Sequence, residues 1–383
     1  MDFALNDEQR LLQQSVERLF TDRYQFDARK RYAQEPAGWS GDLWRQYAEL
    51  GLLGLPFAEE HGGIGGGPVE TMIVMEQIGR ALALEPYLAT VVLAGGLLQF
   101  GDDKKLQAEM LPKIAGGELT LGFAHIERQA RYDLTDVVTT ARRDGAGFVL
   151  DGAKSLVLQG DSANKFIVSA RLSGQRNDRA GLGLFVVDAG AAGVTTRGYG
   201  TVDGQRAAEI QLSGVRVEAD AAIGEPGDAY PLIERAADQA MAALCAEAVG
   251  AMAAMQETTV DYMKTRKQFG VTIGSFQALQ HRAAEMVVAL EQARSMAMLA
   301  TMMATSDDAH ERRQAISAAK VQIGRSGKSI GQAAIQIHGG IGMTMEAKVG
   351  HYFKRVTMID TMFGDADYHL GLIAAAGGLI SAA

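Results

Sequence analysis

The chain has 383 residues, of which 47% are hydrophobic and 22% charged, a composition typical of a soluble globular protein with two or three domains. Its formal net charge of −9 excludes nonspecific nucleic-acid binding, which requires a positive surface field. The single cysteine, Cys245, excludes an intrachain disulfide, and its Ala-, Leu- and Met-rich surroundings predict a buried, inert thiol.

The sequence shows neither a secretory signal nor a membrane span. No basic segment followed by an apolar one is found near the N-terminus. The longest charge-free runs, residues 86–101 and 370–383, fall short of the roughly 18 apolar residues that a spanning helix needs. We therefore expect a cytoplasmic protein that does not insert into a membrane.

Residues 1–118 carry helical patterns. Asn6, followed three residues later by Gln9, predicts the capped start of an amphipathic helix. Further helical segments are predicted around residues 41–54, 68–84 and 86–99. The glycine-rich run at 62–67 lacks the Lys-Ser/Thr end of a phosphate-binding loop, so it predicts a structural turn. This part is predicted to be an N-terminal α-helical domain.

Residues 119–226 carry strand patterns instead. Short β-branched and aromatic runs are separated by Gly, Asp and Asn turns, which is typical of a compact β domain. The runs cover residues 148–150, 165–169, 184–187, 207–212 and 215–217.

Residues 227–383 return to long helical patterns rich in Ala, Met and Leu. The segments cover residues 231–265, 275–305, 308–337 and 346–377. Four antiparallel helices are the simplest arrangement for them. The seven histidines of the chain show no zinc-like spacing, so we expect no metal site.

Two motifs lie within this helical part. The first is Arg266-Lys-Gln-Phe-Gly270, followed by Ile273-Gly-Ser-Phe-Gln277. The second is Gln336-Ile-His-Gly-Gly-Ile-Gly-Met-Thr344. In this order, and within this succession of helices, strands and helices, the chain resembles the acyl-CoA dehydrogenase family. The resemblance implies an α+β fold with an N-terminal helical domain, a central β-barrel domain and a C-terminal four-helix bundle.

The resemblance also implies that the chain contacts FAD. The expected cofactor-binding residues are Arg266, Phe269, Gln277, Gln336, Gly339 and Gly340. In the family, these bundle residues serve a flavin that sits mostly in a neighbouring subunit. A planar guanidinium such as that of Arg266 suits a pyrophosphate, and glycines let the backbone approach a cofactor. The alternatives are a solvated helix-end cation at Arg266 and a simple helix-ending turn at Gly339 and Gly340.

The family's catalytic base is missing from both of its usual places. Where the family has a glutamate before a glycine, this chain has Phe363, and a phenyl ring cannot accept a proton. The alternative place, near the start of the first bundle helix, holds Ala240. Asp365 and Glu247 remain as candidate bases, each with a structural role as the competing interpretation.

The chain's own flavin seat is also altered. In the segment from Glu127 to Asp133, the bulky pair Arg131-Tyr132 stands where the family has Gly-Ser. Leu156 stands in the place of an aromatic that covers the flavin, and Leu158 in that of a hydroxyl that bonds it. Leucine cannot donate a hydrogen bond. The alternative is neutral drift around a flavin that the backbone still holds.

Among relatives, the chain most resembles the small subunit of bacterial pimeloyl-CoA dehydrogenase and the α2β2 steroid side-chain acyl-CoA dehydrogenases. The likeness lies in the start Met1-Asp2-Phe3, in residues 127–132 and in residues 363–367. We therefore predict a heterotetramer in which a larger subunit carries the base and most of each FAD. The reaction would be α,β-dehydrogenation of an acyl-CoA, with electrons passed to an electron-transfer flavoprotein.

Two other functions stay open. The first is a self-sufficient homotetrameric flavoenzyme, nitroalkane-oxidase-like or monooxygenase-like, that uses Asp365 or Glu247. The second is a purely structural subunit. The acyl group is open as well, because dicarboxylyl, branched and steroid-derived thioesters all fit the sequence.

Overall fold

The computed structural model describes residues 5–377, so the segment Met1-Asp2-Phe3 lies outside the described residues. The chain forms two compact units. The bundle unit contains residues up to Lys30, Pro68–Ala83 and the chain from Met241 onward, and the sheet unit contains Arg31–Gly67 and Leu84–Ala240.

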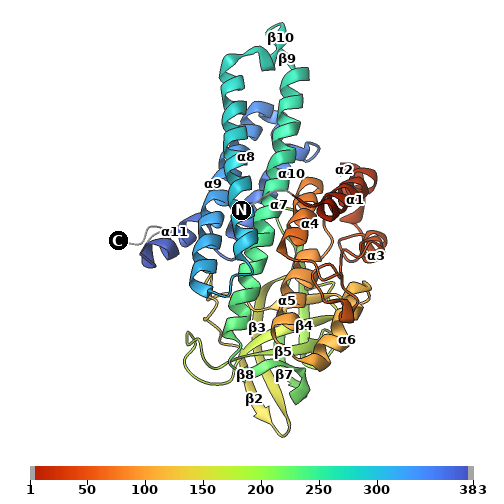
Figure 1. Cartoon of the computed structure of the whole chain (residues 1–383), viewed down its shortest axis with the longest axis vertical. Coiled ribbons are helices and arrows are strands. Elements are labelled where there is room, and N and C mark those ends of the chain that lie inside the picture. The colour runs from red at the N-terminus through yellow and green to blue at the C-terminus, as the bar shows by residue number, and fades with distance from the viewer. Residues whose placement is uncertain (1–4, 378–383) are drawn as a thin grey trace. The chain divides into compact units, whose positions relative to one another are not determined.

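Long helices dominate the bundle unit (Figure 1). Its main helices are α1 (Asp7–Arg23), α4 (Pro68–Ala81), most of α7 (Tyr230–Thr265), α8 (Gln277–Met303), α9 (Ala309–His338), α10 (Lys348–Thr361) and α11 (Ala366–Ala375), and the short α2 (Phe26–Tyr32) follows α1. The predicted cap at Asn6 is confirmed, because its side chain accepts the N–H of Gln9 at 2.8 Å and the Gln9 side chain accepts the N–H of Asn6 at 3.0 Å. Cys245 is buried on α7, as predicted.

The single helix predicted at 346–377 is wrong. The segment forms α10 and α11, which a corner at residues 362–365 separates. Met362 is extended, Phe363 has a φ of 59° and Gly364 a φ of 116°, so the helical hydrogen-bond pattern cannot continue through them. The apolar periodicity on both sides of the corner hid this break from the sequence.

The sheet unit combines short helices with one large sheet. Its helical elements are α3 (Gly41–Glu49), η1 (Glu59–His61), the π-helical η2 (Tyr87–Ala94), α5 (Gly95–Phe100), α6 (Lys104–Ala115) and η3 (Ala219–Ala221). Its strands are β1 (Leu121–Ala124), β2 (Thr140–Asp144), β3 (Gly147–Leu158), β4 (Lys165–Arg171), β5 (Leu182–Asp188), β6 (Val194–Gly200), β7 (Arg206–Val217) and β8 (Ala222–Gly227). The predicted turn at residues 62–67 is a loop between η1 and α4.

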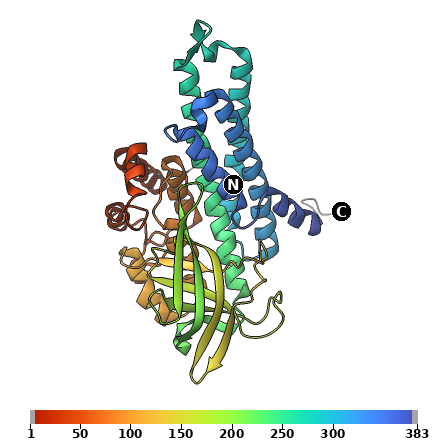
Figure 2. The same cartoon turned by 180° about the vertical axis from the view of Figure 1, so that it is seen from behind.

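The sheet runs in the order β6-β7-β3-β2-β4-β5-β8, and β1 pairs in parallel with β4. Figure 2 shows the long strands of this sheet from behind. Phe148, Phe166 and Phe185 are buried in its core. The long pair β3–β7 shifts register between Lys154 and Val157, and Leu156 has a φ of 50° there. This irregularity falls within the segment in which the sequence placed the altered flavin seat.

Candidate functional site

The two sequence motifs lie side by side at one end of the bundle unit. After α7, the chain forms the hairpin β9 (Lys267–Gln268) and β10 (Val271–Thr272), then η4 (Ile273–Ser275), before α8 begins (Figure 1). Tyr262, in the last turn of α7, stacks on His338, the last residue of α9, with ring centroids 4.4 Å apart. This stack holds the end of α7, which leads into residues 266–277, against the end of α9, where residues 336–345 begin. We call these two segments together the bundle end.

Three polar side chains of the bundle end are exposed and available. Arg266, Gln277 and Gln336 are all exposed, and none has a side-chain hydrogen bond or ion pair within the described part of the chain. Their donors are therefore free to bind a group from outside this chain.

Apolar side chains of the bundle end are exposed too. Phe269 at the tip of the hairpin is 92% exposed and has a φ of 54°, a conformation that costs a bulky residue about 1–2 kcal/mol. Ile341, Met343 and Met345 add further exposed apolar surface. Several large apolar side chains are thus exposed in the bundle end, which is uncommon for a surface that contacts only water.

The glycines of the second motif leave open space beside the backbone. Gly339 ends α9 with a φ of 63°, and its N–H bonds back into the last turn of that helix. A Cβ added at Gly339 or Gly340 would meet no atom within 4 Å. The helix-ending turn is therefore real, and its outer side is accessible to a ligand.

Glu247, one of the two candidate bases, forms an ion pair. It is buried on α7, and its two carboxylate oxygens accept hydrogen bonds from Nε and Nη2 of Arg355 at 2.6 and 2.8 Å. Arg355 is also buried, so this is an interior bidentate pair. The arrangement accounts for Glu247 structurally.

Asp365, the other candidate, caps a helix. Its side chain accepts the N–H of Tyr368 at 2.9 Å at the start of α11. Of the two positions where the family has its base, Ala240 is fully buried and Phe363 is half-buried in the corner between α10 and α11.

The sheet unit holds a buried ion pair beside the altered flavin seat. Lys154 on β3 donates to Glu127 at 2.7 Å, and the Glu127 carboxylate also accepts the N–H groups of Val138 and Thr139. Burial lowers the pKa of Lys154 to about 8, against the opposing effect of Glu127. Burial alone would raise the pKa of Glu127, but the Lys154 charge and the hydrogen bonds lower it to about 2. Both side chains are therefore charged at neutral pH.

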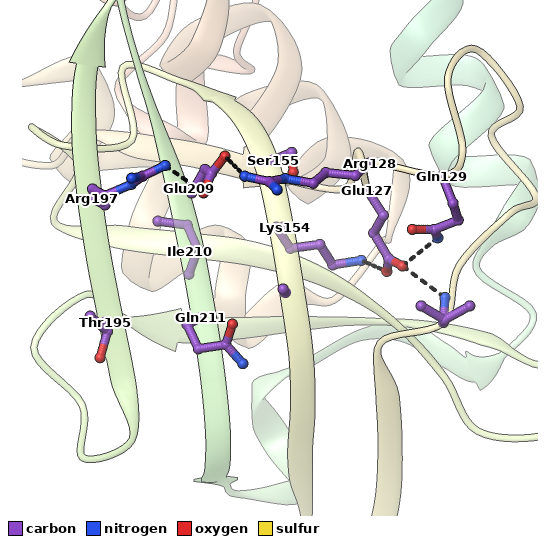
Figure 3. Close-up of a pocket in the computed structure, with 12 residues that line it drawn as sticks. Glu127, Arg128, Gln129, Lys154, Ser155, Thr195, Arg197, Glu209, Ile210 and Gln211 are labelled. Atoms are coloured by element: carbon purple, nitrogen blue, oxygen red, sulfur yellow. Dashed lines mark hydrogen bonds and ion pairs between the residues drawn. The ribbon is translucent and has the colours of Figure 1, made fainter.

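A cavity of about 520 Å³ lies next to this pair (Figure 3). Its lining comprises Glu127, Arg128, Gln129, Val138, Ala153, Lys154, Ser155, Thr195, Arg197, Glu209, Ile210 and Gln211. Arg128 and Arg197 reach Glu209 from opposite sides, at 2.6 and 3.0 Å. Arg131, Tyr132, Leu156 and Leu158 are not among the lining residues, so the substituted positions do not form this cavity.

Two buried side chains near Phe363 were missed by the sequence reasoning. Lys320 on α9 and His369 on α11 both hydrogen-bond to the corner that carries Phe363, at the carbonyl oxygens of Met362 and Phe363. Lys320 could have been noticed as a lone cation between the apolar positions Ile316 and Ile323 of a helix. Its contacts with the corner depend on tertiary packing and leave no local sequence signal.

None of the helices in residues 5–377 combines the length and apolar character needed to cross a membrane.

Comparison with known proteins identifies relatives along the whole chain. The models of the acyl-CoA dehydrogenase N-terminal, middle and C-terminal domains match residues 6–118, 122–215 and 230–378. The chain is similar to the probable acyl-CoA dehydrogenase YngJ of Bacillus subtilis, at 28% identity over 98% of this chain and 99% of YngJ. It is also similar to acyl-CoA dehydrogenase FadE12 of Mycobacterium tuberculosis, at 30% identity over 80% of each chain. Among solved structures, a variant of the Tcur3481–Tcur3483 steroid ACAD matches with a TM-score of 0.85 and 28% identity, over 97% of this chain and 98% of that chain.

Proposed function

The chain belongs to the acyl-CoA dehydrogenase family, and from this premise we propose that it is the small subunit of a heteromeric FAD-dependent acyl-CoA dehydrogenase. In this proposal a larger partner carries the catalytic base and most of each FAD, in an α2β2 assembly. We also propose that the chain is divided into the three domains of this family: a helical domain at residues 1–118, a β domain at 119–226 and a helical bundle at 227–383.

The observation that carries the proposal is a contrast between two parts of the chain. At the bundle end, Arg266 and Gln277 present unused hydrogen-bond donors to the outside. In the sheet unit, Leu156 and Leu158 offer no side-chain donor at all. A chain with this distribution of hydrogen-bond donors is better suited to complete the cofactor site of a neighbouring subunit than to bind a cofactor in its own sheet unit.

The bundle end fits FAD in the chemistry of its groups. The Arg266 guanidinium would pair with the pyrophosphate, and the Gln277 amide would bind near the adenosine half. Gly339 and Gly340 would let the backbone approach the cofactor, because open space lies where a Cβ would be. Phe269 would lie against the flavin as an exposed aromatic. Bound FAD would supply the hydride acceptor.

The four positions considered for the catalytic base also support a partner. Phe363 and Ala240 cannot take a proton, Glu247 is paired with Arg355, and Asp365 caps α11. The partner would therefore remove the substrate α-proton, and the reduced cofactor would pass its electrons to an electron-transfer flavoprotein. A similar solved structure, the Tcur3481–Tcur3483 steroid ACAD, carries the names of two proteins, which also supports a two-subunit enzyme.

The test is to purify the chain alone and together with an acyl-CoA dehydrogenase-like protein encoded by a neighbouring gene, as the proposed larger subunit. Flavin absorbance and turnover of octanoyl-CoA, pimeloyl-CoA and a steroid side-chain CoA thioester would be measured for both samples. The proposal expects flavin and turnover in the complex only. Flavin-dependent turnover by the lone chain would refute it and favour the self-sufficient homotetramer.

A further inference from the structure

The cavity of about 520 Å³ in the sheet unit is built on three neighbouring strands. Thr195 on β6, Gln211 on β7 and Ala153 on β3 stand side by side across these strands. Two residues further along, Arg197 on β6 stands opposite Glu209 on β7. Residues two apart on a strand point to the same face of a sheet, so all five side chains project from one face. A cavity of this volume on that face can hold a small molecule.

Two arginines flank one carboxylate at this cavity (Figure 3). Arg128, in the loop after β1, donates through Nη2 to Oε1 of Glu209 at 2.6 Å, and Nη2 of Arg197 donates to Oε2 at 3.0 Å. The other N–H groups of both guanidiniums have no hydrogen-bond partner within residues 5–377. Both arginine side chains are also highly exposed, at 74% and 73%, so an anion from solvent can reach them.

The cavity lining carries one uncompensated positive charge. Its ionisable residues are three cations and two anions. Lys154 and Glu127 neutralise each other in their buried ion pair, and Glu209 balances one of the two arginines. This local excess of positive charge is opposite to the formal charge of −9 of the whole chain, and it attracts anions to the cavity. A guanidinium with free N–H groups matches the planar geometry of a phosphate or carboxylate.

Neutral polar groups and apolar surface complete the cavity. Ser155, Thr195 and Gln211 line it, and their side chains have no hydrogen-bond partner in the part of the chain that the structure describes. Hydroxyl and amide groups can donate hydrogen bonds to an anion. Val138 and Ala153 also line the cavity and offer apolar contact. The lining is therefore suited to a small organic molecule that carries an anionic group.

We propose that this cavity binds a small organic molecule through an oxyanion, a phosphate or a carboxylate, that Arg128 and Arg197 hold. Glu209 keeps the two guanidiniums in position, Gln211 donates a neutral hydrogen bond, and Val138 contacts the apolar part of the ligand. The site belongs to the sheet unit and does not depend on the role proposed for the bundle end.

Isothermal titration calorimetry of the full-length chain tests the site with phenyl phosphate, benzoate, inorganic phosphate and benzyl alcohol. About 0.15 M NaCl screens general attraction to exposed charges. Phenyl phosphate and benzoate share an aromatic ring, so the tighter binder of the two identifies the anionic group. Without the ring, inorganic phosphate should bind roughly threefold more weakly than phenyl phosphate. Benzyl alcohol, which has no charge, should show no saturable binding.

Substitutions in the cavity should weaken binding of the tighter probe. Arg128→Ala and Arg197→Ala should each raise its Kd roughly fivefold, because each removes a charge-assisted hydrogen bond. Gln211→Leu should raise the Kd roughly threefold through the loss of a neutral hydrogen bond. The matched control is Arg216→Ala, which removes a similarly exposed arginine on β7 that pairs with Asp144 and does not line the cavity. It should leave the Kd at the wild-type value.

Thermal midpoints close to that of the wild type will confirm that the variants fold, as expected for exposed side chains. No saturable binding of either anionic ring compound by the wild type would overturn the proposal. Equal weakening by Arg216→Ala would also overturn it, because binding would then reflect surface charge in general. An effect of the two arginine substitutions without any effect of Gln211→Leu would place the anion outside the cavity, against the proposal. These titrations use neither flavin nor acyl-CoA, so their outcome is independent of the proposed function.

Discussion

Glu247 and Arg355 form a buried ion pair. The effect of a Glu247 substitution on the free energy of unfolding therefore distinguishes a structural role of Glu247 from a catalytic one. Glu247→Gln removes the negative charge that accepts two hydrogen bonds from the buried Arg355 guanidinium. We expect the free energy of unfolding to fall by about 3–5 kcal/mol, measured by urea denaturation of the lone chain.

The control for this change lies on the same helix. Glu257 pairs with Arg80 at 2.8 Å, but both side chains reach solvent, so Glu257→Gln should change stability by no more than about 0.5 kcal/mol. If Glu247→Gln left stability intact but abolished turnover of the complex, Glu247 would be the base.

Two buried histidines make the protein less stable in acid. Burial lowers the pKa of both His125 and His369 to about 3, from an ordinary value near 6.5. Between about pH 6.5 and pH 3 the unfolded chain binds protons that the folded chain does not, so the free energy of unfolding falls as the pH falls. Each histidine contributes a slope of at most about 1.4 kcal/mol per pH unit.

His369→Gln should reduce this slope, because glutamine does not titrate. Urea denaturation at pH 7, 6 and 5 gives the slope for the wild type and the variant. Identical slopes would mean that His369 is not held neutral in the folded chain.

At the scale of elements, helices α4 and α7 pack closely against each other where each has a glycine, Gly79 on α4 and Gly250 on α7. A Cβ on Gly79 would lie 1.9 Å from the carbonyl oxygen of Glu247, and one on Gly250 would lie 1.8 Å from that of Glu76. Each helix thus approaches the backbone of the other at its own glycine. The crossing cannot accept a side chain at either position without moving the helices apart.

Alanine at either glycine should therefore destabilise the protein, although alanine normally favours a helix by about 1 kcal/mol. We expect Gly79→Ala and Gly250→Ala each to lower the free energy of unfolding by about 1–3 kcal/mol. Gly371 on α11, where a Cβ would meet nothing within 4 Å, is the control, and Gly371→Ala should stabilise by about 0.5–1 kcal/mol. A rise in thermal midpoint in all three variants would contradict the close crossing.

The elements that the sequence predicted well are those with continuous apolar periodicity. The segments 231–265, 275–305 and 308–337 agree with α7, α8 and α9 to within two residues at each end. The strands β2 and β6 were missed because their exposed, polar residues carry little apolar alternation. The corner at 362–365 was missed because only backbone geometry reveals it.

At the scale of the whole molecule, the family and its motifs could be identified from sequence, but their arrangement could not. The contact of Tyr262 with His338 brings two motifs together that lie about seventy residues apart. Glu247 hydrogen-bonds to Arg355, and Lys320 hydrogen-bonds to the corner at Met362. Both interactions likewise depend on packing between segments that are distant in the sequence. Long-range contacts of this kind leave no periodic signal in a single sequence.

We propose that this chain works through the bundle end, where it would serve a cofactor held largely by another subunit. Arg266 is the residue with the strongest expected contact, because a guanidinium–phosphate bond is charge-assisted and bidentate. Its loss should weaken FAD binding without disturbing the fold, since it is exposed and makes no side-chain hydrogen bond or ion pair within the described residues.

The most direct measurement is the FAD content of the intact complex carrying Arg266→Ala, at limiting FAD and with complex size checked by gel filtration. Loss of about 1.5–3 kcal/mol should raise the Kd for FAD by roughly 10- to 100-fold. Arg18→Ala, which removes an exposed arginine from α1, should retain the wild-type value. Wild-type FAD affinity in the Arg266→Ala complex would contradict the account and leave a purely structural subunit.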